Sequence, residues 1–411
     1  MFMGTGAAVT YGLLFVSLYF EVFLLVTFLQ RRSRDTLKKG TENLSRFPSV
    51  AIVVPCFNVE KTVVGTIESL LALTYPKDKL EIILVNDGST DGTGNAIQVF
   101  SNTPRVRMFS KENGGKHTAM NLALINTNAE LIGCLDADSF VASDALSRIV
   151  SVFENKKIAA VTPGIHVKKP ENMLQIMQHV EYRLSVFNRF VFAALGSVFI
   201  TPGPFSFFRA HVVRELGGWN YGHATEDMEM ALRIQKAGHL IANAPAASVY
   251  TVTPRTLPAL FRQRVRWTYG FLRNLIDYGY MFGNRRYGNL GLFILPTALI
   301  SIAAGIFFFV RIVWYGSQAI LDMFERFQVV GISMHPSFDP FYINTSVMLF
   351  LVYVSIGLIL TLICIGSYIG TGSKLPPAGT PLFLLFYSFL VPLWLSTAVV
   401  RAIFKTGVQW R

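Results

Sequence analysis

The chain has 411 residues, of which 52% are hydrophobic and only 15% are charged, and its formal net charge is +12 at pH 7. Because soluble domains carry about 25% charged residues, this composition excludes an ordinary soluble protein. The positive charge suits an anionic lipid surface or an anionic substrate, and the sequence has no nucleic-acid-binding motif, so nucleic acid is not an expected partner.

The first predicted element is a membrane span at residues 8–30, a run long enough to cross about 30 Å of hydrocarbon. A signal peptide is the alternative, but no basic residue precedes the run and no small-residue cleavage pattern follows it. Arg31, Arg32 and Arg34 come next, and because cations mark the cytoplasmic side, we expect the following domain in the cytoplasm. Glu21 lies in mid-span, where a carboxyl satisfied by neighbouring helices is favoured over part of a polar path.

Residues 35–255 have the patterning of an α/β domain. Predicted strands lie at 49–58, 81–93 (ending in a turn), 106–111 and 130–138, with helical signals between them at 59–73, 91–100 and 114–127. This alternation predicts a doubly wound, mostly parallel sheet with helices on both faces. Ligands bind such sheets beyond the carboxyl ends of the strands.

Polar residues follow three of these strands: Asn58, Asp87, and the pair Asp136 and Asp138. The first strand is not followed by a glycine-rich pyrophosphate turn, which argues against a dinucleotide site. The Gly-Gly-Lys segment at 114–116 lacks the spacing and the Ser/Thr of a P-loop.

The pair in Leu-Asp-Ala-Asp-Ser (135–139) places two carboxylates two residues apart. Alternate side chains of an extended segment point the same way, and two carboxylates with phosphate oxygens suit Mg²⁺ or Mn²⁺. A solvated turn is the alternative, but the position after a buried strand favours a metal–phosphate site.

Two further polar residues have two readings each. Asp87 is either a turn residue, since Asp-Gly favours turns, or a carboxylate that binds a nucleoside base or ribose. Lys116, at a glycine-rich helix start, either meets a phosphate together with the helix-end N–H groups or does not, and the residue alone does not decide.

Thr225-Glu226-Asp227 precedes a predicted helix. These residues either cap the helix or supply a general base for a sugar hydroxyl, and the stretch alone does not decide between the two.

Residues 256–290 contain a basic amphipathic helix. Its apolar positions recur at helical spacing, at Leu257, Phe261, Val265, Thr268, Leu272 and Leu275, as in helices that lie in a membrane interface. Arg262 and Arg264 are expected to contact the anionic lipid surface.

Three further apolar runs follow, at 291–315, 343–370 and 381–400. We expect residues 291–411 to form a C-terminal membrane region with about three spans. Three spans after a cytoplasmic domain place the C-terminus outside, whereas Arg401, Lys405 and Arg411 weakly favour the opposite side. The last run is therefore a span or an interfacial or re-entrant segment.

Four motifs in this order resemble those of the processive family-2 membrane glycosyltransferases, which include cellulose, hyaluronan, chitin and poly-N-acetylglucosamine synthases. The motifs are D, DxD, TED and QxxRW, found here at Asp87, Asp136–Asp138, Thr225–Asp227 and Gln263–Trp267. The resemblance covers about residues 49–278. It implies a GT-A fold for the cytoplasmic domain at 35–255, between a transmembrane helix at 1–34 and an interfacial region at 256–290.

The resemblance also implies residue roles. The donor- and nucleotide-binding positions correspond to Pro55, Asn58, Glu60, Asp87, Lys116, Asp136 and Arg266. Asp136 and Asp138 match the pair that holds Mg²⁺ or Mn²⁺, with Asp138 the more direct ligand. Asp227 matches the base that deprotonates the acceptor hydroxyl, with Glu226 beside it as a second catalytic carboxylate. The acceptor-binding positions correspond to Gln263, Trp267, Gly203 and Pro204.

The implied activity is inverting polymerisation of a β-linked polysaccharide from a UDP-sugar, with extrusion through the inner or plasma membrane. The compact layout favours UDP-N-acetylglucosamine over UDP-glucose as donor. The partners are then the UDP-sugar, the growing glycan and membrane lipid, and an accessory membrane or export protein is compatible. The alternative is transfer of a single sugar to a lipid such as polyprenyl phosphate, which the QxxRW motif disfavours. A non-catalytic adaptor is disfavoured by the intact Asp138, Asp227 and Arg266.

Overall fold

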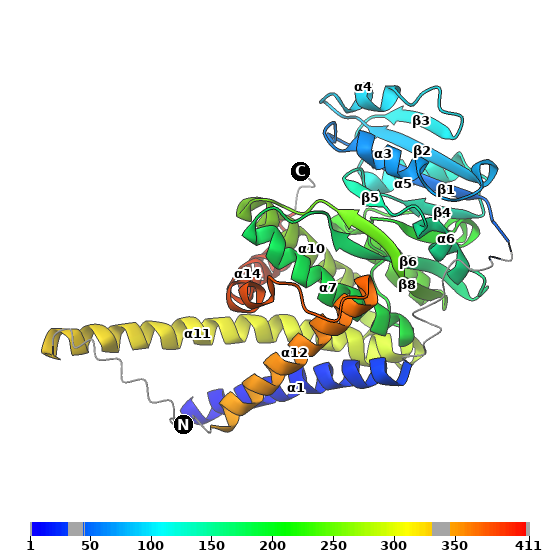
Figure 1. Ribbon diagram of the computed structural model, residues 1–411. Coiled ribbons are helices and arrows are strands. Elements are labelled where there is room, and N and C mark those ends of the chain that lie inside the picture. The colour runs from blue at the N-terminus through cyan, green and yellow to red at the C-terminus, as the bar shows by residue number, and fades with distance from the viewer. Residues whose placement is uncertain (1, 32–43, 45, 331–345, 408–411) are drawn as a thin grey trace.

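The computed structural model of the protein describes residues 2–31, 44, 46–330 and 346–407. Figure 1 shows three layers: a sheet with its covering helices, a middle layer with α7 (Met173–Ala194) and α10 (Leu257–Asp277), and a group of long apolar helices on the side away from the sheet. The middle layer therefore joins the sheet to the apolar helices.

In the described part of the chain the sheet has eight strands, in the order β3-β2-β1-β4-β7-β6-β8-β5. The strands are β1 Val50–Cys56, β2 Leu80–Asp87, β3 Val106–Lys111, β4 Leu131–Cys134, β5 Ser139–Val141, β6 Ile158–Val167, β7 Ser206–Arg209 and β8 Leu240–Thr251. β1 pairs in parallel with β2 and β4, and β2 with β3, as the alternating pattern predicts. β7 is antiparallel to β4 and β6, and β5 to β8. The α/β class is thus confirmed, but the sheet beyond β4 is mixed.

The shorter helices connect and cover these strands. They are α3 Val63–Leu71, α4 Thr93–Gln98, α5 Lys116–Ile125, α6 Ala145–Val152, α8 Ala210–Glu215 and α9 Glu226–Lys236, with 3-10 turns η1 Lys77–Lys79, η2 Gly222–Ala224, η3 Gly279–Met281 and η4 Arg285–Tyr287. The predicted helices at 59–73, 91–100 and 114–127 correspond to α3, α4 and α5. Their ends differ from the predicted bounds by a few residues.

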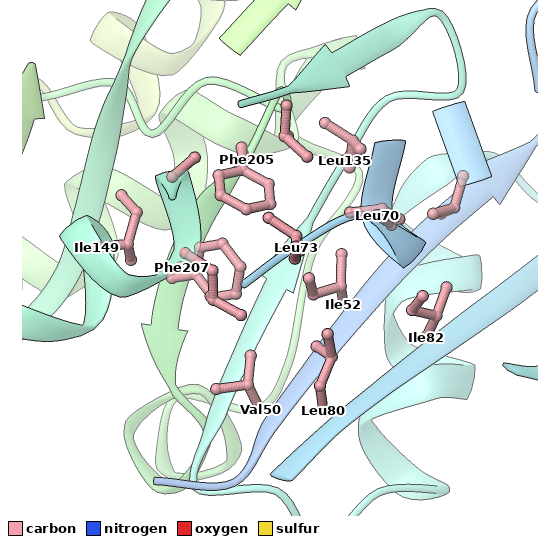
Figure 2. Close-up of a cluster of buried hydrophobic side chains, with 14 of the residues drawn as sticks. Val50, Ile52, Leu70, Leu73, Leu80, Ile82, Leu135, Ile149, Phe205 and Phe207 are labelled. Carbon is pink, nitrogen blue, oxygen red and sulfur yellow. The ribbon is translucent and has the colours of Figure 1, made fainter. Parts of the chain in front are cut away.

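The core explains why β1 is a continuous apolar run. Successive side chains of a strand point to opposite faces, and β1 is buried on both: Ile52 and Val54 join one hydrophobic cluster, while Ala51 and Val53 join another. Figure 2 shows the first cluster, in which Val50 and Ile52 of β1 lie among side chains from three other places. These are β2 (Leu80, Ile82), α3 and the segment after it (Leu70, Leu73), and β7 with the residue before it (Phe207, Phe205). A strand buried on both faces has no polar positions to alternate with its apolar ones.

Four helices are long and apolar enough to cross a membrane: Gly6–Arg31, Leu290–Gln328, Val347–Thr371 and Thr380–Phe404. They correspond to the four predicted spans, and they comprise α1 Phe2–Arg31, η5 Leu290–Ile294 with α11 Leu295–Val330, α12 Val347–Thr371, and α13 Thr380–Leu382 with η6 Phe383–Tyr387 and α14 Ser388–Phe404. The predicted third run began at 343, which lies outside the described residues, as do Arg32, Arg34 and Arg411.

α11 is longer than the predicted run at 291–315. Its 36 residues correspond to about 54 Å at 1.5 Å per residue, whereas the hydrocarbon core is about 30 Å thick. Figure 1 shows α11 extending well beyond α1 and α12. One end of α11 would therefore project past the hydrocarbon if the helix crossed the membrane.

Glu21 of α1 is buried and faces α12. The Ser355 hydroxyl lies 3.1 Å from both carboxylate oxygens of Glu21 and donates to them. The reading of Glu21 as a carboxyl satisfied by a neighbouring helix is confirmed.

The apolar face of α10 packs against α14. Leu260, Val265 and Leu272 of α10 share a buried cluster with Trp394 and Ala398 of α14 and with Tyr387 at the end of η6. An interfacial location of α10 stays a prediction, but much of the face expected to meet lipid is covered by this helix. Leu257, at the start of the predicted stripe, is 48% exposed.

Candidate active site

The loops that follow β1 and β2 meet at the carboxyl ends of these parallel strands. The side-chain oxygen of Asn58 accepts hydrogen bonds from the backbone N–H of Thr90 at 2.9 Å and from its hydroxyl at 3.3 Å. Glu60 accepts from the N–H of Gly92 at 3.2 Å, and Pro55 lies within β1. The three predicted donor residues are therefore near one edge, where two of them hold the loops together. Their contact with a nucleoside stays a prediction.

The carboxylate of Asp87 is buried and shapes the glycine loop. It accepts hydrogen bonds from Gly114 N–H at 3.1 Å and Gly115 N–H at 2.9 Å, and its Oδ1 lies 2.6 Å from Lys111 Nζ. The sequence reading did not include Lys111. Lys111 is brought beside Asp87 by the sheet register, in which Asp87 of β2 pairs with Lys111 of β3. This register becomes visible only when the two strands are paired. Asp87 thus positions the start of α5, which carries Lys116.

Lys116 links two of the predicted motifs. Its Nζ lies 2.5 Å from Asp136 Oδ1 and 3.6 Å from Glu226 Oε1. Burial opposes the charge of this amine, but Asp136 and Glu226 outweigh the cost and raise the pKa of Lys116 well above its usual value. A permanent cation therefore stands between DxD and TED.

The Asp136–Asp138 pair lies in a turn and not at the end of an extended strand. β4 ends at Cys134, and the N–H of Ser139 donates to the Asp136 carbonyl at 2.9 Å, closing the turn before β5. The extended geometry expected for this segment was wrong. The two carboxylates remain two residues apart in one turn, and Asp138 Oδ1 accepts from the Ser139 hydroxyl at 3.2 Å.

The donor set of this turn fits a hard divalent ion. Within the described ranges no group of three or more His, Cys, Asp and Glu is arranged to hold a metal, so the protein offers the two carboxylates of Asp136 and Asp138. Mg²⁺ is bound in this way, by one or two carboxylates with substrate phosphates and water. A Cβ at Gly203 would lie 2.7 Å from Asp136 Oδ2, so the glycine keeps space free beside that carboxylate.

Asp227 stands in the first turn of α9. Thr225 occupies the N-cap position but makes no side-chain capping bond, whereas Asp227 Oδ1 accepts from the Met228 N–H at 2.9 Å. Burial is the main cause that raises the pKa of Asp227 to about 7, and the neighbouring Glu226 adds to it, while Lys116 and Arg266 act in the opposite direction. A buried carboxylate with a raised pKa is a stronger base than a solvated one.

The loop before β7 joins these groups. Thr201 donates its hydroxyl to the backbone carbonyl of Asp227 at 2.7 Å, and a Cβ on Gly203 would lie 2.1 Å from Lys116 Nζ. Residues Thr201, Gly203, Lys116, Glu226 and Asp227 line one narrow cavity. The structure therefore brings the predicted base, the donor lysine and one acceptor residue together. Contact of Gly203 and Pro204 with an acceptor stays a prediction.

The three residues of the QxxRW motif differ in their surroundings. Arg266 Nη1 donates to the Ala224 carbonyl at 3.4 Å, just before the TED motif. Trp267 is 38% exposed, and the Arg264 guanidinium lies 4.2 Å from its ring centroid. The buried Oε1 of Gln263 has no hydrogen-bond partner among the residues that the structure describes. Arg266 is thus next to the candidate base, while ligand contacts of Gln263 and Trp267 remain predictions.

The assignment of Arg264 to the lipid surface was wrong. Arg264 is 4% exposed, and its Nη2 lies 2.6 Å from Glu181 Oε2 of α7. The Tyr387 hydroxyl donates to the same oxygen at 2.7 Å. Helical periodicity placed Arg264 off the apolar face of α10 but gave no information on a partner from another helix. Arg262 is exposed, and its contact with lipid stays a prediction.

Replacing Arg264 with methionine is expected to destabilise the protein by about 3 kcal/mol, because removing one partner of a buried ion pair leaves an uncompensated charge. Thermal or denaturant unfolding of the purified protein in detergent measures this. Arg262→Met is the matched control on the same helix and should change stability by no more than about 0.5 kcal/mol, as surface substitutions usually do. Equal losses in the two variants would contradict the structural role of Arg264.

The sequence of this chain matches a family model described as glycosyltransferase like family 2, over residues 48–270. Poly-beta-1,6-N-acetyl-D-glucosamine synthase of Staphylococcus aureus (strain COL) is 30% identical over 261 residues, 62% of this chain and 63% of the relative. The synthase of the same name from Staphylococcus epidermidis is 28% identical over 267 residues, 63% of this chain and 64% of the relative. The alignments thus span less than two thirds of these relatives.

Among solved structures, the mannosyltransferase PcManGT from Pyrobaculum calidifontis, in complex with GDP-Man and Mn²⁺, has a TM-score of 0.59 to this structure. The match covers 96% of this chain and 100% of that chain at 18% sequence identity. At this identity the likeness shows the fold: the sheet and its helices have the GT-A arrangement.

Proposed function

Because the chain belongs to the glycosyltransferase-like family 2, we propose that it is an inverting glycosyltransferase that polymerises a β-linked polysaccharide from a UDP-sugar. UDP-N-acetylglucosamine is the favoured donor, in line with the named activity of the staphylococcal relatives, and UDP-glucose is the next. The observation that carries the proposal is the position of the Lys116 amine, which lies between the carboxylates of Asp136 and Glu226. Glu226 immediately precedes the candidate base, Asp227.

In this proposal each residue of the site has a separate role in the reaction. Asp227 takes the proton of the acceptor hydroxyl as that oxygen attacks the anomeric carbon. The bond from the anomeric carbon to the leaving diphosphate breaks on the opposite face of the sugar, which inverts the configuration. Lys116 and Arg266 supply fixed positive charge where negative charge develops on the diphosphate. Trp267 supports the acceptor sugar from below.

Asp136 and Asp138 would hold the divalent ion. When bound, Mg²⁺ or Mn²⁺ supplies Lewis-acid neutralisation of the diphosphate; the solved neighbour was determined with Mn²⁺. The nucleotide-sugar donor is likewise consistent with the GDP-Man of that complex.

The proposed location is the inner or plasma membrane, with several spans and a cytoplasmic catalytic domain. Four helices of sufficient length and apolarity support the multi-pass arrangement, and the basic residues after the first span support the orientation. In this arrangement α7 and α10 lie between the sheet and the apolar helices (Figure 1). The division of the chain at residues 34, 255 and 290 is part of the same proposal.

The test is nucleotide release by the purified protein with Mg²⁺ or Mn²⁺ across a panel of UDP-sugars and GDP-mannose, followed by sizing of the product. We expect release with UDP-N-acetylglucosamine and a polymeric product. A single-sugar lipid product would instead identify the non-processive alternative. No release with any donor would refute the enzymatic proposal.

The acidity of Asp227 predicts the pH profile. Because Asp227 acts only when ionised and burial raises its pKa from 3.8 to about 7, kcat/KM should fall about tenfold per pH unit below that value. The measurement is kcat/KM for the preferred donor from pH 5 to pH 9, since this ratio reports the free enzyme. A flat profile from pH 5 to pH 8 would show that the base does not have a pKa near 7 and would contradict the role given to Asp227.

A further inference from the structure

The chain adopts an uncommon backbone conformation immediately before the TED motif. Gly222, His223 and Ala224 form η2 with φ values of 54°, 54° and 66°, so three successive residues lie in the left-handed region. This region is unfavourable for residues with a Cβ, and such conformations persist only where the surroundings enforce them. The structure must therefore contain contacts that hold this turn.

These contacts come from one side of α10. The buried amide of Asn274 donates to the Gly222 carbonyl at 3.0 Å and to Thr225 Oγ1 at 2.9 Å, and Thr225 Oγ1 donates to the Gly222 carbonyl at 2.8 Å. Arg266 reaches the Ala224 carbonyl from the same side of the helix, two turns earlier. A side chain at every fourth position of a helix faces one direction, so residues 266, 270 and 274 form one stripe.

Gly270 stands in the middle of this stripe. A Cβ built on it would lie 2.3 Å from Thr225 Oγ1 and 2.5 Å from Thr225 Cγ2. A Cβ essentially never comes within 3.0 Å of an atom outside its own residue and its two chain neighbours, so any larger residue at 270 would push the turn away from α10. The absence of a side chain at 270 is what allows Asn274 to reach the turn.

The turn also fixes where the carboxylates lie. α9 begins at Glu226, directly after Thr225, so a shift of the turn would move the first turn of this helix. His223 makes a further contact between the turn and α10, because its Nε2 lies 2.7 Å from Oδ2 of Asp277 at the end of that helix. On the other side, Thr201 holds the carbonyl of Asp227.

We propose that Asn274 and Gly270 are positioning residues of the reaction: from α10 they hold the left-handed turn that sets the location of the Glu226 and Asp227 carboxylates. The proposal rests on the proposed function of Asp227 as the base. Neither residue touches a reacting atom. Their effect is on the distance between the base and the acceptor hydroxyl, where a misplacement of about 1 Å costs about 100-fold in rate.

Asn274→Ala and Gly270→Ala test this in the full-length protein in detergent. We expect kcat with the preferred UDP-sugar to fall about 100-fold in both, while the donor KM and the affinity for UDP with Mn²⁺ change less than threefold. Asn274→Gln, which keeps the amide donor, should recover part of the loss. Gly279→Ala is the matched control, because no atom lies within 4 Å of a Cβ built there, and its kcat should equal that of the parent.

The outcomes separate this inference from the proposed function. Parental kcat in both alanine variants, with an inactive Asp227→Asn protein, overturns the positioning role alone. Equal losses of kcat and UDP affinity, or unfolding of Gly270→Ala at assay temperature, would show a general structural role and overturn it as well. Parental activity of Asp227→Asn overturns the proposed base instead.

Discussion

Asp227→Asn is expected to lower kcat by about 10²–10⁴-fold, the range that general base catalysis contributes, while the affinity for UDP stays unchanged. Asparagine keeps the size and the hydrogen-bond acceptor of the side chain but cannot take a proton. The nucleotide-binding candidates Asp87 and Asp136 do not use the Asp227 side chain as a partner in any described hydrogen bond or ion pair. Single-turnover rates and UDP titration of the same protein preparation measure the two effects.

The Asp227→Asn variant should fold at least as well as the parent. An acid whose pKa is higher in the folded state than in the unfolded state loses stability as pH rises from its unfolded pKa to its folded pKa, and keeps that penalty above it. Burial raises the pKa of Asp227 in this way, so a neutral side chain removes the penalty at and above pH 7. Thermal unfolding of Asp227→Asn and of the parent at pH 8 checks this prediction.

The control for the kcat prediction is Asp144→Asn, at the start of α6, which should keep parental kcat. Polymer formation by Asp227→Asn at the parental rate would exclude Asp227 as the base.

The sequence predicted the parallel half of the sheet because each strand there is a continuous apolar run. Ile52 and Val53 are buried on opposite faces of the sheet, so successive residues of the strand are apolar and the strand can be recognised from the sequence. The sequence did not predict that β7 is inserted antiparallel between β4 and β6, because pairing between strands distant in sequence leaves no periodic signal. The predicted strand at 130–138 is also longer than β4, which ends at Cys134. The apolar pattern does not encode the backbone turn in which the Ser139 N–H donates to the Asp136 carbonyl.

Individual site residues were predictable, but their partners were not. Lys116 and Asp136 were both selected from the sequence, each as a separate ligand-binding residue. Their ion pair, at 2.5 Å, depends on how α5 packs against β1 and β2 and on the turn that follows β4. Arg264 was assigned to lipid for the same reason, since its partner Glu181 is 83 positions away. Spacing within one element identifies a face, and contacts between elements need the fold.

Arg266→Gln is expected to reduce kcat/KM by about 10²–10³-fold, the loss seen when one preorganised donor to a developing charge is removed. It should also weaken UDP binding, because the proposed partner of the guanidinium is the diphosphate. This second effect separates Arg266 from Asp227 and Asn274, whose variants should bind UDP normally. Initial rates at several donor concentrations and titration with UDP in Mn²⁺ give both quantities.

Arg262→Gln is the matched control for Arg266→Gln, because it removes an exposed arginine from the same helix. It should keep parental kcat/KM and lower only the association of the protein with anionic vesicles. Arg266→Lys gives a further distinction: lysine keeps the charge but cannot form two parallel hydrogen bonds to a phosphate, so its kcat/KM should lie between the values for arginine and glutamine. Equal losses for Arg262→Gln and Arg266→Gln would mean that α10 acts through its total charge, and the assignment of Arg266 to the diphosphate would then be wrong.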